Sequence, residues 1–370
     1  MKLRFRRVLL VSALLSLLLA AWAGLLRLGW TLPPFPAADH GPLMISGFLG
    51  TLIALERAVA LSASFKHGSW AYAAPLLSAL GAAALVVGAP HAISIGLITL
   101  GSLGLVVIFL ALVQRQFALF SVTMALGALC WLLGNVLWLT GQPIYHLVEW
   151  WIAFLVLTIA GERLELTRIM RHSRASQIIF MGILAVYVVG LLLTTLQMNA
   201  GTLLIGISLL ALGLWLFRYD IARRTVKQAG LTRYIAFCLL AGYGWLLVGG
   251  ALRVGFGTQI AGLFYDAELH SVLLGFVFSM ILGHAPIILP AVLNVSMPFR
   301  QWFYVPLLLL HGSLILRIGA DLSAAFVLRQ WGGMFNVIAI LLFLTITLFT
   351  VYHAEASKRT KRRQEAVRSN

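Results

Sequence analysis

The residues with the clearest capacity for chemistry are three histidines placed in strongly apolar segments: His40, His146 and His270. An ionisable side chain at membrane depth costs free energy, and such residues usually mark functional sites. A neutral imidazole is a good ligand for heme iron and for copper, and two facing imidazoles can hold a b-type heme without a covalent link. The three histidines are therefore predicted metal ligands.

His40 and His146 share a spacing to charged residues at the far end of their segments. In both cases a glutamate follows sixteen residues after the histidine, and an arginine comes directly after that glutamate. The two pairs are Glu56-Arg57 and Glu162-Arg163. The segment of His270 has no such pair and carries GHAPIILP in its place. The pattern predicts an internal repeat in which the three segments are equivalent.

The predicted depth of His270 sets it apart from the other two histidines. His40 and His146 begin their segments, where a histidine bonded to water at the membrane interface is the simpler interpretation of either one alone. About seven residues of helix precede His270, which places it roughly 10 Å below the surface. A buried neutral histidine needs a hydrogen-bond partner or a metal. The joint placement of all three favours the ligand interpretation.

Other polar residues in the apolar segments have competing interpretations. Glu149 lies on the same helix face as His146, where it could orient the imidazole or line a proton path. His284 and His311 are expected at a similar depth and could hold a second metal, although a hydrogen-bonded pair in the core is favoured. The two Glu-Arg pairs are expected to form ion pairs that fix helices together rather than to serve transport. Two isolated cysteines, Cys130 and Cys238, are expected to be packing residues.

These residues belong to an all-α, polytopic membrane protein. The 370-residue chain is 61% hydrophobic and 10% charged, with a mean hydropathy of +0.98. Apolar runs of about twenty residues, each long enough to cross a bilayer, recur along its whole length. Twelve spans are predicted, beginning near Arg7, His40, Gly68, His91, Phe117, Tyr145, Ser176, Ala200, Leu231, Gly262, Trp302 and Gly332.

The net charge of +16 is explained by topology rather than by nucleic acid. With the N-terminus inside, all but four of the 27 lysines and arginines fall on the inner side, as the positive-inside rule requires. The four on the outer side are Arg27, Arg253, Arg317 and Arg329. Both termini are then cytoplasmic, and we expect a multi-pass protein of the bacterial inner membrane.

The domain organisation follows from the same pattern. No soluble domain interrupts the spans, so residues 1–354 are predicted to form a single twelve-span transmembrane domain. Residues 355–370 are a basic cytoplasmic tail that we expect to be disordered. The three histidine segments are each separated by four helices and run in the same direction, which predicts three pseudo-symmetric four-helix arcs around a shared centre.

At the level of motifs, the layout resembles the catalytic subunit of the heme-copper oxidases, in which the second and tenth helices hold a low-spin heme and the sixth supplies a copper ligand. HGPLM resembles the second helix of that family and HSVLLGFVF, with ILP further on, its tenth helix. The chain is more closely similar to the NnrS family of twelve-span heme and copper proteins, linked to nitric oxide stress and denitrification. The pieces that carry this similarity are HGPLMISGFLGTLIA, GYGWLLVGGALRVG, LHSVLLGFVFSMILGHAP and LLLLHGSLILRIGADL.

The resemblance implies a heme b held by His40 and His270, with His146 as the contributor to a copper site. Two departures limit it: Glu268 stands where the oxidases have a second histidine on the tenth helix, and SQIIFMGILAVYVVGLLLTTLQ lacks their adjacent His-His copper pair. A full oxygen-reducing centre is therefore not expected, and no catalytic residue is assigned.

Two functions of different classes follow from these patterns. The first is a membrane protein that binds heme, with or without copper, and that responds to nitric oxide or performs small-gas or redox chemistry, with the heme, a diatomic ligand and the lipid bilayer as its partners. The alternative is a metal-free transporter coupled to protons or a solute, in which the outer histidines and inner Glu-Arg pairs act as gates. Bound heme or copper would separate the two.

Overall fold

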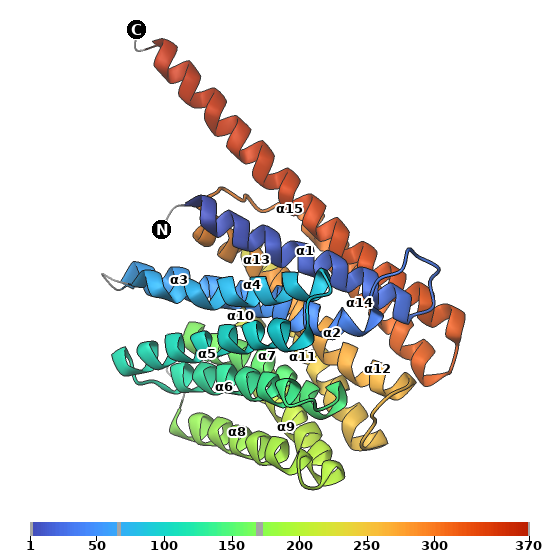
Figure 1. Cartoon of the computed structure of the whole chain (residues 1–370). Helices are drawn as coiled ribbons and strands as arrows, with labels where there is room; N and C mark the ends of the chain where they lie inside the picture. Colours follow the sequence, from blue (N-terminus) through green and yellow to red (C-terminus); the bar gives the residue numbers. More distant parts are fainter. Residues whose placement is uncertain (1–2, 65–67, 168–172, 369–370) are drawn as a thin grey trace.

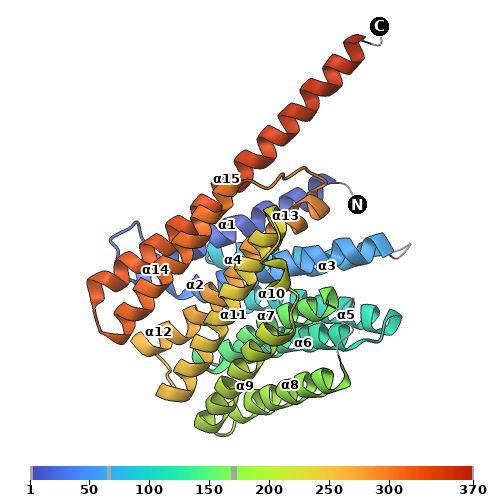
Figure 2. The ribbon, with the colours of Figure 1, turned by 180° about the vertical axis from the view of Figure 1, so that it is seen from behind.

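A computed structural model describes residues 3–64, 68–167 and 173–368, and within these ranges the chain is helical with no strand. Twelve helices or helix groups are long and apolar enough to cross a membrane, as predicted. They are arranged as one bundle, and the first and last helices, α1 (Leu3–Arg27) and α15 (Phe326–Arg368), have their terminal ends on the same side of it (Figures 1 and 2). We call that side the inner end and the opposite side the outer end.

Most spans are single helices. Their bounds are α1 (Leu3–Arg27), α5 (His91–Arg115), α6 (Leu119–Leu139), α7 (Ile144–Leu166), α8 (Arg174–Thr194), α9 (Met198–Tyr219), α11 (Gly230–Phe256) and α15 (Phe326–Arg368). The third span joins a short 3-10 turn, η3 (Gly68–Tyr72), to α4 (Ala73–Val86), and the eleventh joins η6 (Gln301–Phe303) to α14 (Tyr304–Leu322). A short helix outside the spans, α10 (Ala222–Thr225), follows α9.

The second and tenth spans have a composite construction that the sequence did not predict. The second runs through η1 (Ala37–Asp39), α2 (His40–Pro42), the π-helix η2 (Leu43–Gly50) and α3 (Thr51–Ser64). The tenth runs through α12 (Leu263–His270), the π-helix η5 (Ser271–Phe278) and α13 (Ser279–Leu293). π-Helical segments are rare and are found most often at functional sites. Here one follows each of the two histidines proposed to hold heme.

The tail differs from the sequence expectation in its backbone conformation. Helix α15 continues through residues 355–368 to Arg368. The segment is rich in Ala, Glu, Lys and Arg, which favour a helix, and it contains neither Gly nor Pro. Figures 1 and 2 show this part of α15 extending away from the bundle at the inner end.

Close approach between neighbouring helices depends on glycine at a few positions. A Cβ atom added to Gly250 of α11 would lie 2.8 Å from the carbonyl oxygen of Gly206 on α9. A Cβ atom added to Gly101 of α5 would lie 2.9 Å from the backbone nitrogen of Ser78 on α4. Small residues let backbones meet in this way, which increases the dispersion contacts that hold membrane helices together.

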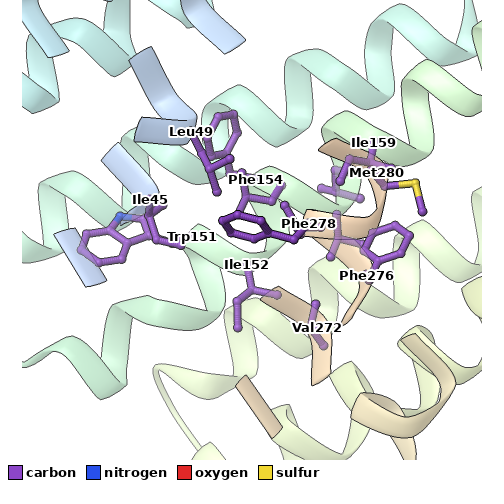
Figure 3. Close-up of a cluster of buried hydrophobic side chains, with 14 of the residues drawn as sticks. Ile45, Leu49, Trp151, Ile152, Phe154, Ile159, Val272, Phe276, Phe278 and Met280 are labelled. Carbon is purple, nitrogen blue, oxygen red and sulfur yellow. The ribbon is translucent and has the colours of Figure 1, made fainter. Parts of the chain in front are cut away.

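The three spans that carry His40, His146 and His270 are the most enclosed of the twelve. In their most apolar windows 61%, 83% and 67% of the residues are buried, and no other span exceeds 56%. Figure 3 shows side chains from all three meeting in one cluster, with Leu49 from the second span, Phe154 from the sixth and Phe278 from the tenth. The histidine-bearing spans therefore lie at the centre of the bundle.

Candidate functional site

His40 and His270 face each other at the outer end of the bundle. Their ring centroids are 6.2 Å apart and the ring planes are inclined by 28°. His40 is the first residue of α2 and His270 is the last residue of α12. Two residues separated by most of the chain therefore form one site, as the sequence predicted for this pair.

A backbone hydrogen bond fixes the orientation of each ring. The Nδ1 atom of His40 lies 2.7 Å from the carbonyl oxygen of Ala20 on α1, and the Nδ1 atom of His270 lies 2.8 Å from that of Asp266, one turn earlier in α12. A carbonyl oxygen can only accept, so Nδ1 must carry the hydrogen in both rings. The Nε2 atom of each ring then keeps its lone pair, which is the state required of a metal ligand.

Helix α1 approaches the His40 ring so closely that only glycine fits at position 24. A Cβ atom added to Gly24 would lie 2.9 Å from Cε1 and Nδ1 of His40. Gly41, directly after the histidine, has open space around it instead. The position of the His40 ring is therefore determined by α1 as well as by its own helix.

Both histidines line a cavity of about 440 Å³. Its walls are mainly apolar and come from α1, the second span, the start of α7, the tenth span and α15. The apolar lining includes Leu25, Leu28, Ile45, Val148, Leu273, Phe278, Val337 and Ile340. Its charged lining residues are Arg27, Asp266, Arg317 and Arg329, all near the outer end. The cavity thus has an apolar interior and a cationic rim.

Ion pairs organise the rim. The guanidinium group of Arg317 donates to both carboxylate oxygens of Asp266, with Nε–Oδ2 and Nη2–Oδ1 distances of 2.9 Å each. Arg329 lies between two carboxylates, with its Nη2 atom 3.4 Å from Oδ1 of Asp266 and its Nε atom 2.7 Å from Oδ1 of Asp321. These contacts tie α12 to α14 and α15.

The sequence interpretation listed these arginines but missed their role. Three of the four arginines that it placed on the outer side, Arg27, Arg317 and Arg329, line the cavity. Lysine and arginine are depleted from outer loops, so each exception needs a local reason. The presence of arginines on the outer side was visible in the sequence, and it could have been used to predict the charged rim of the cavity.

A second facing pair lies below the histidines. Phe48 and Phe278 each follow the histidine of their span by eight residues, and their ring centroids are 6.1 Å apart. In an α-helix a position eight residues on is rotated by roughly 80° from the first. The π-helical segments η2 and η5 have more residues per turn, which reduces this rotation and brings each phenylalanine back toward the face of its histidine.

The third predicted ligand, His146, is not brought into this cluster. Its ring packs on Tyr145, with centroids 4.5 Å apart, and Tyr145 rather than His146 lines the cavity. Within the described residues no group of three His, Cys, Asp or Glu side chains is arranged to hold a metal ion. A copper ion on His146 stays a prediction.

Glu149, which was expected to orient the His146 imidazole or to line a proton path, contacts Arg253 instead. Its Oε1 atom accepts a hydrogen bond of 2.8 Å from Nη2 of Arg253, which is fully buried. This ion pair explains why Arg253, the fourth of the arginines placed on the outer side, can be buried there. Burial of a guanidinium group requires a counter-charge, and Glu149 supplies it.

The inner ends of the second and sixth spans are joined by an ion pair, as predicted for the Glu-Arg pairs, and the sixth span is also paired with the residue that caps α9. Arg57 of the second span pairs with Glu162 of the sixth and also contacts Glu56. Arg163 of the sixth span donates to both carboxylate oxygens of Asp220, at 2.8 and 3.1 Å. These ion pairs cross between helices and fix their relative positions.

The interpretation of His284 and His311 as a pair was wrong. The Nη1 atom of Arg163 is 3.3 Å from Nε2 of His284, whose Nδ1 atom is 2.8 Å from the Met280 carbonyl oxygen. His311 instead accepts a hydrogen bond of 2.9 Å from Nε1 of Trp245. Both nitrogens of His284 are thus engaged in contacts with other residues. The cysteines Cys130 and Cys238 are buried and unpaired, as expected.

The fold and the site define the class of protein: a helical membrane protein with twelve candidate spans. Two facing histidines line an apolar cavity whose rim is cationic. Residues 6–352 match the family model described as Domain of unknown function (DUF8744). The match covers most of the chain, and the protein belongs to that family. Comparison with curated proteins and with solved structures found no match.

Proposed function

We propose that this protein binds one b-type heme between His40 and His270 and works in nitric oxide response or related small-gas redox chemistry. The proposal rests on the facing imidazoles. A metal ion binds an imidazole nitrogen at about 2 Å, and the ring centre lies about 1 Å beyond that nitrogen, so two imidazoles on opposite sides of one metal have centres about 6 Å apart. The observed separation of 6.2 Å fits this requirement.

The cavity residues also suit a heme. The volume of about 440 Å³ lies within the range of roughly 300–1,000 Å³ that is usual for ligand and cofactor pockets. Its apolar walls match the macrocycle, and Arg27 at the rim matches the two carboxylate groups of a heme. His40 and His270 would hold the iron, with Phe48 and Phe278 closing the space below them.

The donor set decides which chemistry the site can support. A heme held by His40 and His270 would supply one-electron redox chemistry. The residues of this chain would fix the two rings through the carbonyl groups of Ala20 and Asp266, exclude water with apolar walls and balance charge at the rim. Direct binding of a diatomic gas would require an open position at a second metal, for which His146 is the candidate.

The overall arrangement belongs to the same proposal. We infer that the twelve spans form three four-helix arcs of the heme-copper-oxidase type and that the family is related to NnrS. Two observations support this: the three histidine-bearing spans are the most enclosed, and charged contacts link their inner ends in sequence, from Arg57 to Glu162 and from Arg163 to His284.

The proposal is tested on the purified protein by optical spectroscopy together with metal analysis. The reduced protein is expected to show the absorption bands of a b-type heme at about one heme per chain. Copper in the same sample would support a second metal site at His146. A preparation with neither heme nor copper, even when it is supplied with hemin, would overturn the proposal and leave the metal-free transporter.

A further inference from the structure

Asp266 offers two different acceptors to the Nδ1–H group of His270. The hydrogen bond runs to the backbone carbonyl oxygen of Asp266, at 2.8 Å. The carboxylate of the same residue is also close, with its Oδ1 atom 3.4 Å from Nδ1. A carboxylate is the stronger acceptor, because a charged partner roughly doubles the strength of a hydrogen bond. Its failure to take the proton needs an explanation.

Arg317 provides that explanation. Its Nη2 atom donates to Oδ1 of Asp266, the same oxygen that faces His270, while Nε donates to Oδ2. The guanidinium fork therefore holds both carboxylate oxygens in one plane. Arg317 is 7% exposed, so water does not compete for this pair.

Helix α15 holds Arg317 in place. A Cβ atom added to Gly332 of α15 would lie 2.8 Å from the Cα, Cβ and N atoms of Arg317. Backbone packing of this kind leaves Arg317 little freedom to move. Arg329 has a different arrangement, because its closest carboxylate contact is with Asp321 and its contact with Asp266 is 3.4 Å.

We propose that Arg317 is a positioning residue for the heme ligand His270: by clamping the Asp266 carboxylate it leaves the imidazole bonded to a neutral carbonyl and so keeps the heme potential high. The inference rests on the proposed function. A carboxylate acceptor on Nδ1–H makes the imidazole a more basic ligand, which stabilises oxidised iron and lowers the potential. The residues that set the potential would then lie on α12, α14 and α15 together.

The test is a double-mutant cycle read out by redox titration of the heme. Arg317→Lys keeps the positive charge but loses the fork that occupies both oxygens. It is expected to shift the midpoint potential to a lower value and to change the electron paramagnetic resonance signature of the oxidised heme. In an Asp266→Asn background the same Arg317→Lys change is expected to have no such effect, because no carboxylate remains to be released. Arg253→Lys is the matched control, because Arg253 is a buried outer arginine that pairs with Glu149 and is not among the residues lining the cavity; it is expected to leave both readouts unchanged.

The outcomes separate this inference from the heme proposal. If the wild-type protein contains no heme, the proposed function is wrong. If Arg317→Lys contains heme with the same midpoint potential as the wild type, only the proposed role of Arg317 is wrong. An equal shift in the Asp266→Asn background also overturns it, because the effect would then not pass through the carboxylate. If Arg317→Lys fails to retain heme, the single variant Asp266→Asn decides the question. An unchanged resonance signature in Asp266→Asn supports the backbone carbonyl as the acceptor of the His270 Nδ1–H group. An altered signature overturns the inference, because the carboxylate is then already the acceptor.

Discussion

At the scale of single residues, the site depends on which nitrogen of each imidazole is left available. His40 and His270 each use Nδ1 for a carbonyl oxygen, one on a neighbouring helix and one on the same helix. The cost of burying a polar ring is thereby offset at one nitrogen, and the other is left for a ligand.

The first prediction concerns His270. His270→Ala removes one proposed axial ligand, so the protein should insert normally but lose its heme, as measured by the ratio of heme to protein in the purified sample. His311→Ala is the matched control, because His311 is bonded to Trp245 and should not affect heme content. His146→Ala should keep heme and lower copper. Full retention of heme in His270→Ala would refute the ligand assignment, and equal loss in the other two variants would mean that the wrong helices were paired.

The second prediction tests the contact between α1 and the His40 ring. Gly24→Ala places a methyl group 2.9 Å from the imidazole, so the ring must move out of line with His270. Overpacking of this kind costs about 1–3 kcal/mol, and we expect reduced heme occupancy in titrations with hemin. Gly96→Ala adds the same methyl group in open space on α5, at a residue that is not among those lining the cavity, and should bind heme like the wild type. Equal occupancy in both variants would argue against a role for ring position.

At the scale of elements, the π-helices change which residues face the site. A regular α-helix would rotate Phe48 and Phe278 away from their histidines, and the pair beneath the imidazoles would not form. The loop before α12 adds to this control. Gly257 ends α11 with φ 66° and Gly262 precedes α12 with φ 91°, conformations that other residues rarely adopt. These turns direct the chain back into the bundle so that His270 faces His40.

The third prediction concerns the inner ion pairs. Arg163→Gln leaves the buried carboxylate of Asp220 without its counter-charge, which should destabilise the protein by about 3–5 kcal/mol. Thermal unfolding in detergent would show the loss as a lower midpoint. Heme content at low temperature should stay the same, because the charge lies at the inner end. Arg224→Gln, an exposed arginine on the same side, is the control and should unfold like the wild type. A similar midpoint in both variants would contradict a structural role for Arg163.

At the scale of the whole molecule, the functional centre and the membrane-facing surface are separated. The second, sixth and tenth spans are the most enclosed, and the remaining spans surround them with exposed apolar side chains. The site therefore combines residues from the beginning and the end of the chain. α1 and α15 both line the cavity, so the cavity is complete only when the first and last spans have joined the bundle.

The fourth prediction concerns the end of α15. A hydrogen bond of 3.1 Å from the Ser296 backbone N–H to the Glu355 carboxylate ties this part of α15 to the rest of the bundle. Removal of residues 359–370 should therefore leave the unfolding midpoint and the heme content unchanged. Glu355→Ala removes the Ser296 contact and should lower the midpoint slightly. A loss of heme in the truncated protein would show that the projecting part of the helix supports the site.

The sequence determined the twelve spans and the central place of three of them, whereas the pairing of His40 with His270 was an implication of the family resemblance. Apolar run length, the distribution of charge and the recurrence of a histidine at fixed intervals are properties of the chain order, and a bilayer turns them directly into topology. The end of α15 differs from the sequence expectation of disorder. Helix-forming residues are abundant there, and they favour a helix despite the high charge.

Only the tertiary structure decided the partners of the charged and polar residues. Asp266 binds Arg317, Glu149 binds Arg253 and His284 faces Arg163, and none of these partners was assigned beforehand. Each contact depends on how far a helix is rotated about its axis. The π-helical segments alter that rotation, and glycine contacts set the distance between axes, so a polar side chain cannot be assigned its partner from spacing alone.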